Sequence, residues 1–141
     1  MRNIGLDIGD RRIGVAISDA EQILASPLTT LVIDDEGENK VFQSISSLVA
    51  KYQVHRIVIG LPFSMNGSVG IQATKVKSFT EKLAEYVKVQ IEYYDERLST
   101  VAVDRLMKAA DSKKRKHREH RDAAAAAYIL QGYLDSLKKE S

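Results

Sequence analysis

The sequence predicts one α/β domain built on a sheet that mixes antiparallel and parallel strands. Three strand-like segments come first with no helix between them, and later strands alternate with helices. Consecutive strands favour an antiparallel meander, whereas strand–helix alternation favours parallel additions to the same sheet. A length of 141 residues suits a single domain over residues 1–141, with a core that needs no disulfide.

The first two segments predict a β-hairpin. Residues 3–9 alternate between apolar residues on one face and small or polar residues on the other, and residues 12–18 repeat this division. A two-residue turn at residues 10–11 would place Asp7 across from Gly14 in the paired strands. Asp7 would then stand on a face lined by small residues.

The remaining elements follow from apolar periodicity. A third strand over residues 24–33 contains Pro27, which cannot donate to a ladder, so this strand must be an edge or carry a bulge. An acidic loop is expected over residues 34–39. The unbroken apolar run at residues 57–59 is typical of a parallel strand covered on both faces. Helices are predicted at residues 41–52, 76–87, 103–110 and 121–137, and a last strand at 89–93.

Composition excludes several classes of protein. Hydrophobic residues make up 44% and charged residues 28% of the chain, which is ordinary for a globular protein. The longest wholly apolar run, residues 123–130, is too short to span a membrane. The absence of cysteine excludes a disulfide framework, a thiol nucleophile and a cysteine zinc site. We expect a cytoplasmic protein without a secretory signal.

Positive charge is concentrated in one stretch of the chain. The net charge is +2, yet residues 105–121 hold eight Lys and Arg against two acids, so this stretch carries +6 and the rest −4. A basic segment attracts nucleic acid through its phosphates without reading sequence. We therefore predict a nucleic-acid-binding loop within residues 111–120; the alternative is a merely solvated loop. Its candidate contacts are Lys113, Lys114, Arg115, Lys116 and Arg118.

Asp7 is the first candidate for chemistry. Glycines inside a strand often mark the close approach of a ligand or of another backbone, and Gly5 and Gly9 flank this carboxylate. We interpret Asp7 as a functional acid. The alternative is that the glycines admit a packed helix and that Asp7 caps a turn.

Further acids can reach the same edge of the sheet. Asp95 and Glu96 close the last strand, and ligands of open α/β sheets bind outside the carboxyl ends of the parallel strands. The alternative there is a solvated loop in which Ser99 or Thr100 caps the next helix. Asp122 lies in the first turn of the last predicted helix, where the helix dipole alone would favour an acid by about 0.3–1 kcal/mol.

Together the acids predict a divalent-metal site. Gathered carboxylates repel one another unless they are protonated or bound to cations, and oxygen ligands without cysteine suit Mg²⁺ or Mn²⁺. Two such ions about 3.5–4 Å apart serve phosphodiester cleavage.

The histidines add little: His55 is expected to be structural, and His117 and His120 to face solvent. The alternative for His120 is that it assists Asp122.

Short motifs in order along nearly the whole chain resemble those of the YqgF (RuvX) family. They are Gly5-Leu6-Asp7-Ile8-Gly9, Arg12-Ile13-Gly14-Val15-Ala16, Ser18-Asp19, Gly60-Leu61-Pro62, Asn66-Gly67-Ser68, Asp95-Glu96-Arg97-Leu98-Ser99-Thr100 and Asp122-Ala123-Ala124. The resemblance implies the ribonuclease H-like fold of Holliday-junction resolvases such as RuvC, with a five-stranded mixed sheet in the order 3-2-1-4-5 flanked by helices. It also implies Asp7, Glu96 and Asp122 as the metal-binding catalytic acids.

The resemblance implies two activities. Family members are described as Holliday-junction resolvases and as nucleases that mature the 5′ end of the small-subunit ribosomal RNA precursor, and the second role is the better reading of the family. The chain departs from RuvC, which takes an acid from the end of its fourth strand, where this sequence has residues 60–62 as Gly-Leu-Pro. Glu96 on the fifth strand must serve instead. RuvC also has two acids in its last helix, whereas Asp122 has no acidic partner before Asp135.

We therefore expect an Mg²⁺- or Mn²⁺-dependent endonuclease with a two-metal site that acts on structured RNA in ribosome maturation. The alternatives are a resolvase of branched DNA, which should be a dimer, and a non-catalytic RNA-binding module. No membrane partner is expected, and the chain is expected to be a monomer or a homodimer. Supporting roles in orienting water or contacting phosphate are assigned to Gly9, Arg12, Asp19, Asp95 and Arg97.

Overall fold

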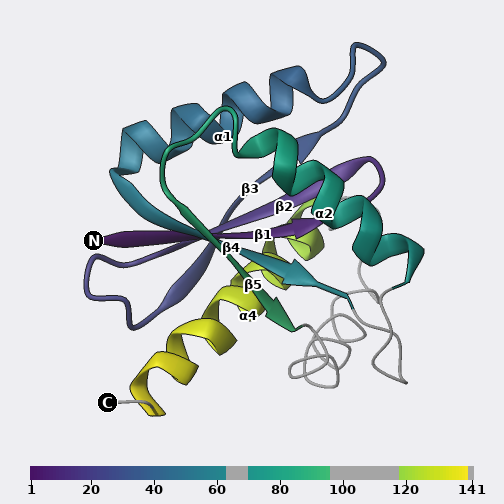
Figure 1. Ribbon diagram of the computed structural model, residues 1–141. Helices are drawn as coiled ribbons and strands as arrows, with labels where there is room; N and C mark the ends of the chain where they lie inside the picture. Colours follow the sequence, from purple (N-terminus) through teal and green to yellow (C-terminus); the bar gives the residue numbers. More distant parts are fainter. Residues whose placement is uncertain (63–69, 96–117, 140–141) are drawn as a thin grey trace.

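The computed structural model describes residues 1–62, 70–95 and 118–139. These parts form a five-stranded sheet in the order β3-β2-β1-β4-β5, in which β1–β2 and β2–β3 are antiparallel and β1–β4 and β4–β5 are parallel. The elements are β1 (Arg2–Ile8), β2 (Arg12–Ser18), β3 (Ala25–Val32), α1 (Asn39–Tyr52), β4 (Val54–Leu61), α2 (Ile71–Leu83), β5 (Gln90–Asp95) and α4 (Arg118–Lys139). The mixed sheet and its strand order confirm the predicted architecture (Figure 1).

The β1–β2 hairpin has the predicted register. Asp7 pairs with Gly14, and Gly5 pairs with Ala16. The hairpin is closed by a hydrogen bond of 2.9 Å from the amide of Gly9 to the carbonyl oxygen of residue 12. Because side chains alternate between faces, the small residues of the two strands share one face of the sheet.

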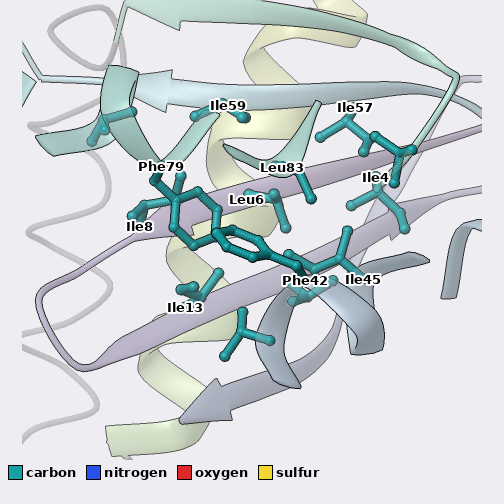
Figure 2. Packing of buried hydrophobic residues seen from close by; sticks show 14 of the residues in the cluster. Ile4, Leu6, Ile8, Ile13, Phe42, Ile45, Ile57, Ile59, Phe79 and Leu83 are labelled. Carbon is teal, nitrogen blue, oxygen red and sulfur yellow. The ribbon is translucent and has the colours of Figure 1, made fainter. Parts of the chain in front are cut away.

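Two apolar clusters lie on opposite faces of the sheet. The larger one packs alternate strand residues against α1 and α2, with the rings of Phe42 and Phe79 4.9 Å apart between centroids (Figure 2). The smaller one packs the strands against α4 through residues such as Leu130. Strand β4 contributes Ile57 to the larger cluster and Val58 to the smaller, so it is buried on both faces as predicted.

Helix α4 lies directly on the small-residue face. A Cβ atom added at Gly5 would fall 2.7 Å from the Cβ of Leu130, and one added at Gly14 would collide with the carbonyl oxygen of Asp122. The alternative interpretation of the glycines, that they admit a packed helix, is therefore correct for these two positions. The close contact also fixes where Asp122 sits on the sheet.

The β2–β3 connection holds a more distant part of α4. The side chain of Gln131 accepts a hydrogen bond of 2.9 Å from the amide of Ala25 and donates one of 2.9 Å to the carbonyl oxygen of Ile23. Strand β3 is an edge of the sheet, and its pairing with β2 shifts register next to the pair of Ala16 and Pro27. Both predicted consequences of the proline therefore occur.

Several element boundaries between α1 and β5 differ from the predicted ones, including the start of α2 at Ile71 where residue 76 was predicted. Strand β4 begins at Val54, so His55 lies inside it, where its Nδ1 is 2.9 Å from the carbonyl oxygen of Arg2. This contact agrees with a structural role for the histidine. Helix α2 ends at Leu83, and Tyr86 lies in the following turn, where its amide donates to the carbonyl oxygen of Leu83.

Helix α4 begins three residues earlier than predicted. Arg118 and His120 therefore belong to the helix and not to the predicted basic loop. Arginine and glutamate at this start and the alanines that follow all favour helix, which explains the extension. The helix predicted at residues 103–110 and residues 111–117 of the loop lie outside the described residues. None of the described helices is both long enough and apolar enough to cross a membrane.

Candidate active site

Asp7 lies near the carboxyl end of the central strand β1 and is half-buried. Alternation along the strand puts its side chain on the same face as Gly5, the face that α4 covers. Its partner across the hairpin is Gly14. Asp7 therefore projects from a rigid strand towards the layer between the sheet and α4.

Asp122, on α4, lies over the strand residue that pairs with Asp7. Its carbonyl oxygen lies against Gly14, so the helix backbone passes over the residue that pairs with Asp7. Asp122 is also the fifth residue of the helix, beyond the first turn in which a helix dipole favours an acid. The structure thus brings two of the three predicted acids next to one glycine.

Arg12 is the ion-pair partner of Asp122. Its Nε atom lies 2.8 Å from Oδ2 of the carboxylate, and the two side chains are 35% and 23% exposed. The Oδ2 atom is shielded from solvent and has no well-directed hydrogen bond, so the contact is mainly electrostatic. Arg12 was predicted to contact phosphate, whereas in the structure its guanidinium is engaged by an acid of the site.

The strand that supplies the third predicted acid ends at the same edge of the sheet. Asp95 is the last residue of β5, pairs with Leu61 of β4 and is half-buried. Because β1, β4 and β5 are parallel, Asp95 and Asp7 lie at the same edge, as predicted. Glu96, Arg97 and the loop residues 113–117 lie outside the described residues.

Two supporting residues do not have the surroundings predicted for them. Asp19 lies beyond the other end of β2, five residues and about 16 Å along the strand from Gly14. Its Oδ1 accepts the amides of Ile23 at 2.7 Å and Leu24 at 3.0 Å, and these bonds lower the pKa of Asp19. It holds a turn and cannot orient water at Asp7. The amide of Gly9 is used by the hairpin, so it is not available to a phosphate.

The donor chemistry of the site suits a hard divalent cation. Asp7 and Asp122 both supply carboxylate oxygens next to Gly14, and among the described residues the buried Oδ2 of Asp122 has the guanidinium of Arg12 as its ion-pair partner. Carboxylate oxygens are what Mg²⁺ and Mn²⁺ prefer. Within the described residues no group of three or more acidic, histidine or cysteine side chains is close enough to hold a metal ion. The described part of the chain contains two of the three predicted ligands, Asp7 and Asp122.

Sequence reasoning missed a groove of about 350 Å³ on the opposite side of the hairpin. The side chain of Gln72 donates to the carbonyl oxygen of Ile8 at 3.3 Å, and Lys75 lies 3.3 Å from the carboxylate of Asp10. These contacts tie α2 to the end of β1 and to the hairpin turn. The exposed lysines of α2 were the sequence signal that could have indicated it.

A polar cluster beneath α4 was also missed. The hydroxyl of Tyr133 donates a hydrogen bond of 2.5 Å to Glu92, and the guanidinium of Arg56 lies 5.4 Å from the ring centre of the tyrosine. Nearby, burial and then the charges of Asp135 and Asp95 raise the pKa of Tyr94. The sequence signal for this cluster was a charged residue inside each of two neighbouring strands, Arg56 in β4 and Glu92 in β5.

The amino-acid sequence that builds this sheet and helix also matches a protein-family model. The family model named RuvX, Holliday junction resolvase, matches residues 1–136. The chain belongs to this family. The membership confirms the resemblance seen in the motifs.

RuvX relatives match the chain over nearly its full length. A protein of Clostridium botulinum (strain Hall) named "Putative pre-16S rRNA nuclease" is 46% identical over 139 residues, which are 99% of this chain and 100% of that protein. A protein of the same name from Bacillus cytotoxicus is 43% identical over 136 residues, 96% and 99% of the two chains.

Two solved structures that resemble this RuvX chain in fold are resolvases. Thermus thermophilus RuvC in complex with a Holliday junction substrate gives a TM-score of 0.63 at 12% identity, over 98% of this chain and 96% of that one. Fowlpox virus resolvase in complex with Holliday junction DNA gives 0.57 at 13% identity, over 97% and 99%. The likeness confirms the ribonuclease H-like fold.

Proposed function

We propose that this chain is a divalent-metal-dependent endonuclease that matures the 5′ end of the 16S ribosomal RNA precursor. The observation that carries the proposal is that Asp7 pairs with Gly14 and that the backbone of Asp122 lies against the same glycine. This place is at the carboxyl edge of a ribonuclease H-like sheet. The names of the curated relatives support this substrate. The proposed activity implies a cytoplasmic protein.

Each acid has a distinct structural support in the proposed mechanism. Asp7 is held by the central strand, Asp122 by the backbone contact of α4, and Glu96 directly follows the end of β5. We assign the three as ligands of Mg²⁺ or Mn²⁺. Bound ions supply the activation of water at neutral pH and the stabilisation of the leaving oxygen. The supports of Asp7 and Asp122 would keep these two carboxylates in place with little reorganisation during the reaction.

The substrate's backbone is proposed to lie against the basic stretch. Residues 113–116 are four consecutive cations shortly before Asp122 in the chain. Cations at this distance in sequence from a catalytic acid would bring phosphates to the site without selecting a base. RNA binding should then weaken steeply as the salt concentration rises.

A cleavage assay tests the proposal. The substrates are a precursor 16S RNA 5′ leader, a four-way DNA junction and linear controls of each, with Mn²⁺ or Mg²⁺. We expect the wild-type chain to cut the RNA leader and Asp7→Asn to lose this activity with its fold intact. Asp10→Asn is the matched control, because Asp10 is an exposed acid of the same hairpin whose partner is Lys75. Full activity of Asp7→Asn would contradict the mechanism.

A junction resolvase is the second candidate function. The description of the family model, Holliday junction resolvase, favours it. A resolvase acts on a two-fold junction and should be a dimer in solution. Cutting of the junction alone by a dimeric chain would establish this function in place of the first. RNA binding without any cutting would instead support a non-catalytic binding module.

A further inference from the structure

The ion pair between Arg12 and Asp122 joins two elements that are otherwise linked by backbone contact. Arg12 begins β2 and Asp122 lies in the second turn of α4. The guanidinium Nε is 2.8 Å from Oδ2, an oxygen that solvent does not reach. One oxygen of the Asp122 carboxylate is therefore already paired with a cation of the protein, the guanidinium of Arg12.

The same oxygen is one that a divalent ion would use. Asp7 pairs across the hairpin with Gly14, and the backbone of Asp122 lies against the same glycine. Carboxylates brought to one site repel one another, which favours a cation there. A guanidinium is a bulky donor of directed hydrogen bonds, whereas Mg²⁺ or Mn²⁺ requires direct oxygen contact at about 2.0–2.1 Å. Arg12 and an ion therefore compete for Oδ2 of Asp122.

We propose that Arg12 is a built-in substitute for the divalent cation. It neutralises Asp122 and holds this part of α4 on the sheet, and binding of the ion displaces it. Arg12 is thus a positioning residue that sets how much divalent cation the site needs. The inference rests on the proposed function, since it concerns the same metal site.

Mn²⁺ titration followed by electron paramagnetic resonance of the free ion tests the competition. We expect Arg12→Gln to bind Mn²⁺ about two- to fivefold more tightly than the wild-type chain, because a partly exposed ion pair of ordinary strength no longer has to be broken. Arg12→Lys keeps the charge and should restore an affinity close to that of the wild type. Arg11→Gln is the matched control, since Arg11 is an exposed arginine in the same turn. Unchanged or weaker Mn²⁺ binding by Arg12→Gln overturns the inference.

Two further measurements separate this inference from the proposed function. Asp122→Asn should lose most of the Mn²⁺ affinity; if no variant binds Mn²⁺, the proposed function fails and the inference with it. If Asp122→Asn loses the ion while Arg12→Gln binds as the wild type does, only the inference fails. In the wild-type chain, titration with Mg²⁺ should shift the ¹⁵N–¹H resonance of the Arg12 Nε, and an unchanged resonance at saturation overturns the displacement. Circular dichroism checks that each variant is folded.

Discussion

The carbonyl oxygen of Asp122 lies against the α-carbon of Gly14, so α4 meets β2 with no side chain between them. Gly14 is the cross-strand partner of Asp7. One glycine therefore decides both how closely the helix packs and how near the two carboxylates come. The contact connects the packing of the fold directly to the chemistry proposed for it.

Gly14→Ala should destabilise the protein. The added methyl group would collide with the backbone of α4, and overpacking of this kind costs about 1–3 kcal/mol of unfolding free energy. Urea denaturation followed by circular dichroism measures the loss. Gly70→Ala is the control, because a Cβ atom there meets nothing within 4 Å among the described residues beyond its chain neighbours. Equal stability of the two variants would contradict the close contact.

Asp122→Asn should reduce cleavage of the RNA leader by about 100-fold or more, since even residues behind a metal ligand cost about 10–100-fold when changed. The rate at saturating Mn²⁺ is the measurement. Asp135→Asn on the same helix is the comparison, because Asp135 is exposed and interacts with Gln131 away from the site. If both variants lose the same activity, Asp122 has no special role.

Tyr133→Phe should lower stability without lowering cleavage at saturating metal. The hydroxyl of Tyr133 donates to Glu92, which also lies 3.9 Å from Arg56, and loss of a hydrogen bond to a charged group costs about 1.5–3 kcal/mol. Thermal and urea unfolding give the change in stability. Tyr93→Phe, at an exposed ring of the same strand, should leave stability unchanged. Unchanged stability of Tyr133→Phe would show that the half-buried pair of Arg56 and Glu92 does not need the phenol.

The turn held by Asp19 should make stability depend on pH in the acid range. Hydrogen bonds from the amides of Leu24 and Ile23 lower the pKa of Asp19, so the folded chain binds this proton less readily than the unfolded chain. The stabilisation is fully present above the unfolded pKa, about 3.9, and is lost as the pH falls through the lower folded value. Urea unfolding of the wild type and Asp19→Asn should differ at pH 6 and converge towards pH 2.5. A constant difference would contradict this origin.

The hairpin around Asp7 could be predicted from sequence because its determinants are local. Strand side chains alternate with a period of two, and a two-residue turn leaves one register that places both apolar faces on the same side. Pro27 likewise predicts an edge strand, because proline has no backbone N–H to donate to a neighbouring strand. The strand order came from the resemblance, since periodicity alone does not decide which strands are neighbours.

The surroundings of Arg12 and Asp19 could not be predicted in the same way. The partner of Arg12 depends on where α4 docks, and no local pattern connects Arg12 to a residue so far along the chain. Asp19 was assigned to the site because it belongs to a shared motif, although an aspartate that accepts nearby backbone amides is ordinary turn chemistry. The start of α4 was placed late because charge was taken as the mark of a loop.

Gln131 holds the β2–β3 connection by two hydrogen bonds, about 13 Å along the helix axis from Asp122. A straight helix passes an axial displacement from one end to the other with little loss. The two hydrogen bonds of Gln131 therefore help to hold α4, and with it Asp122, at one position along β2. The β2–β3 connection thus contributes to the position of Asp122 over Gly14, although it lies at the opposite end of β2.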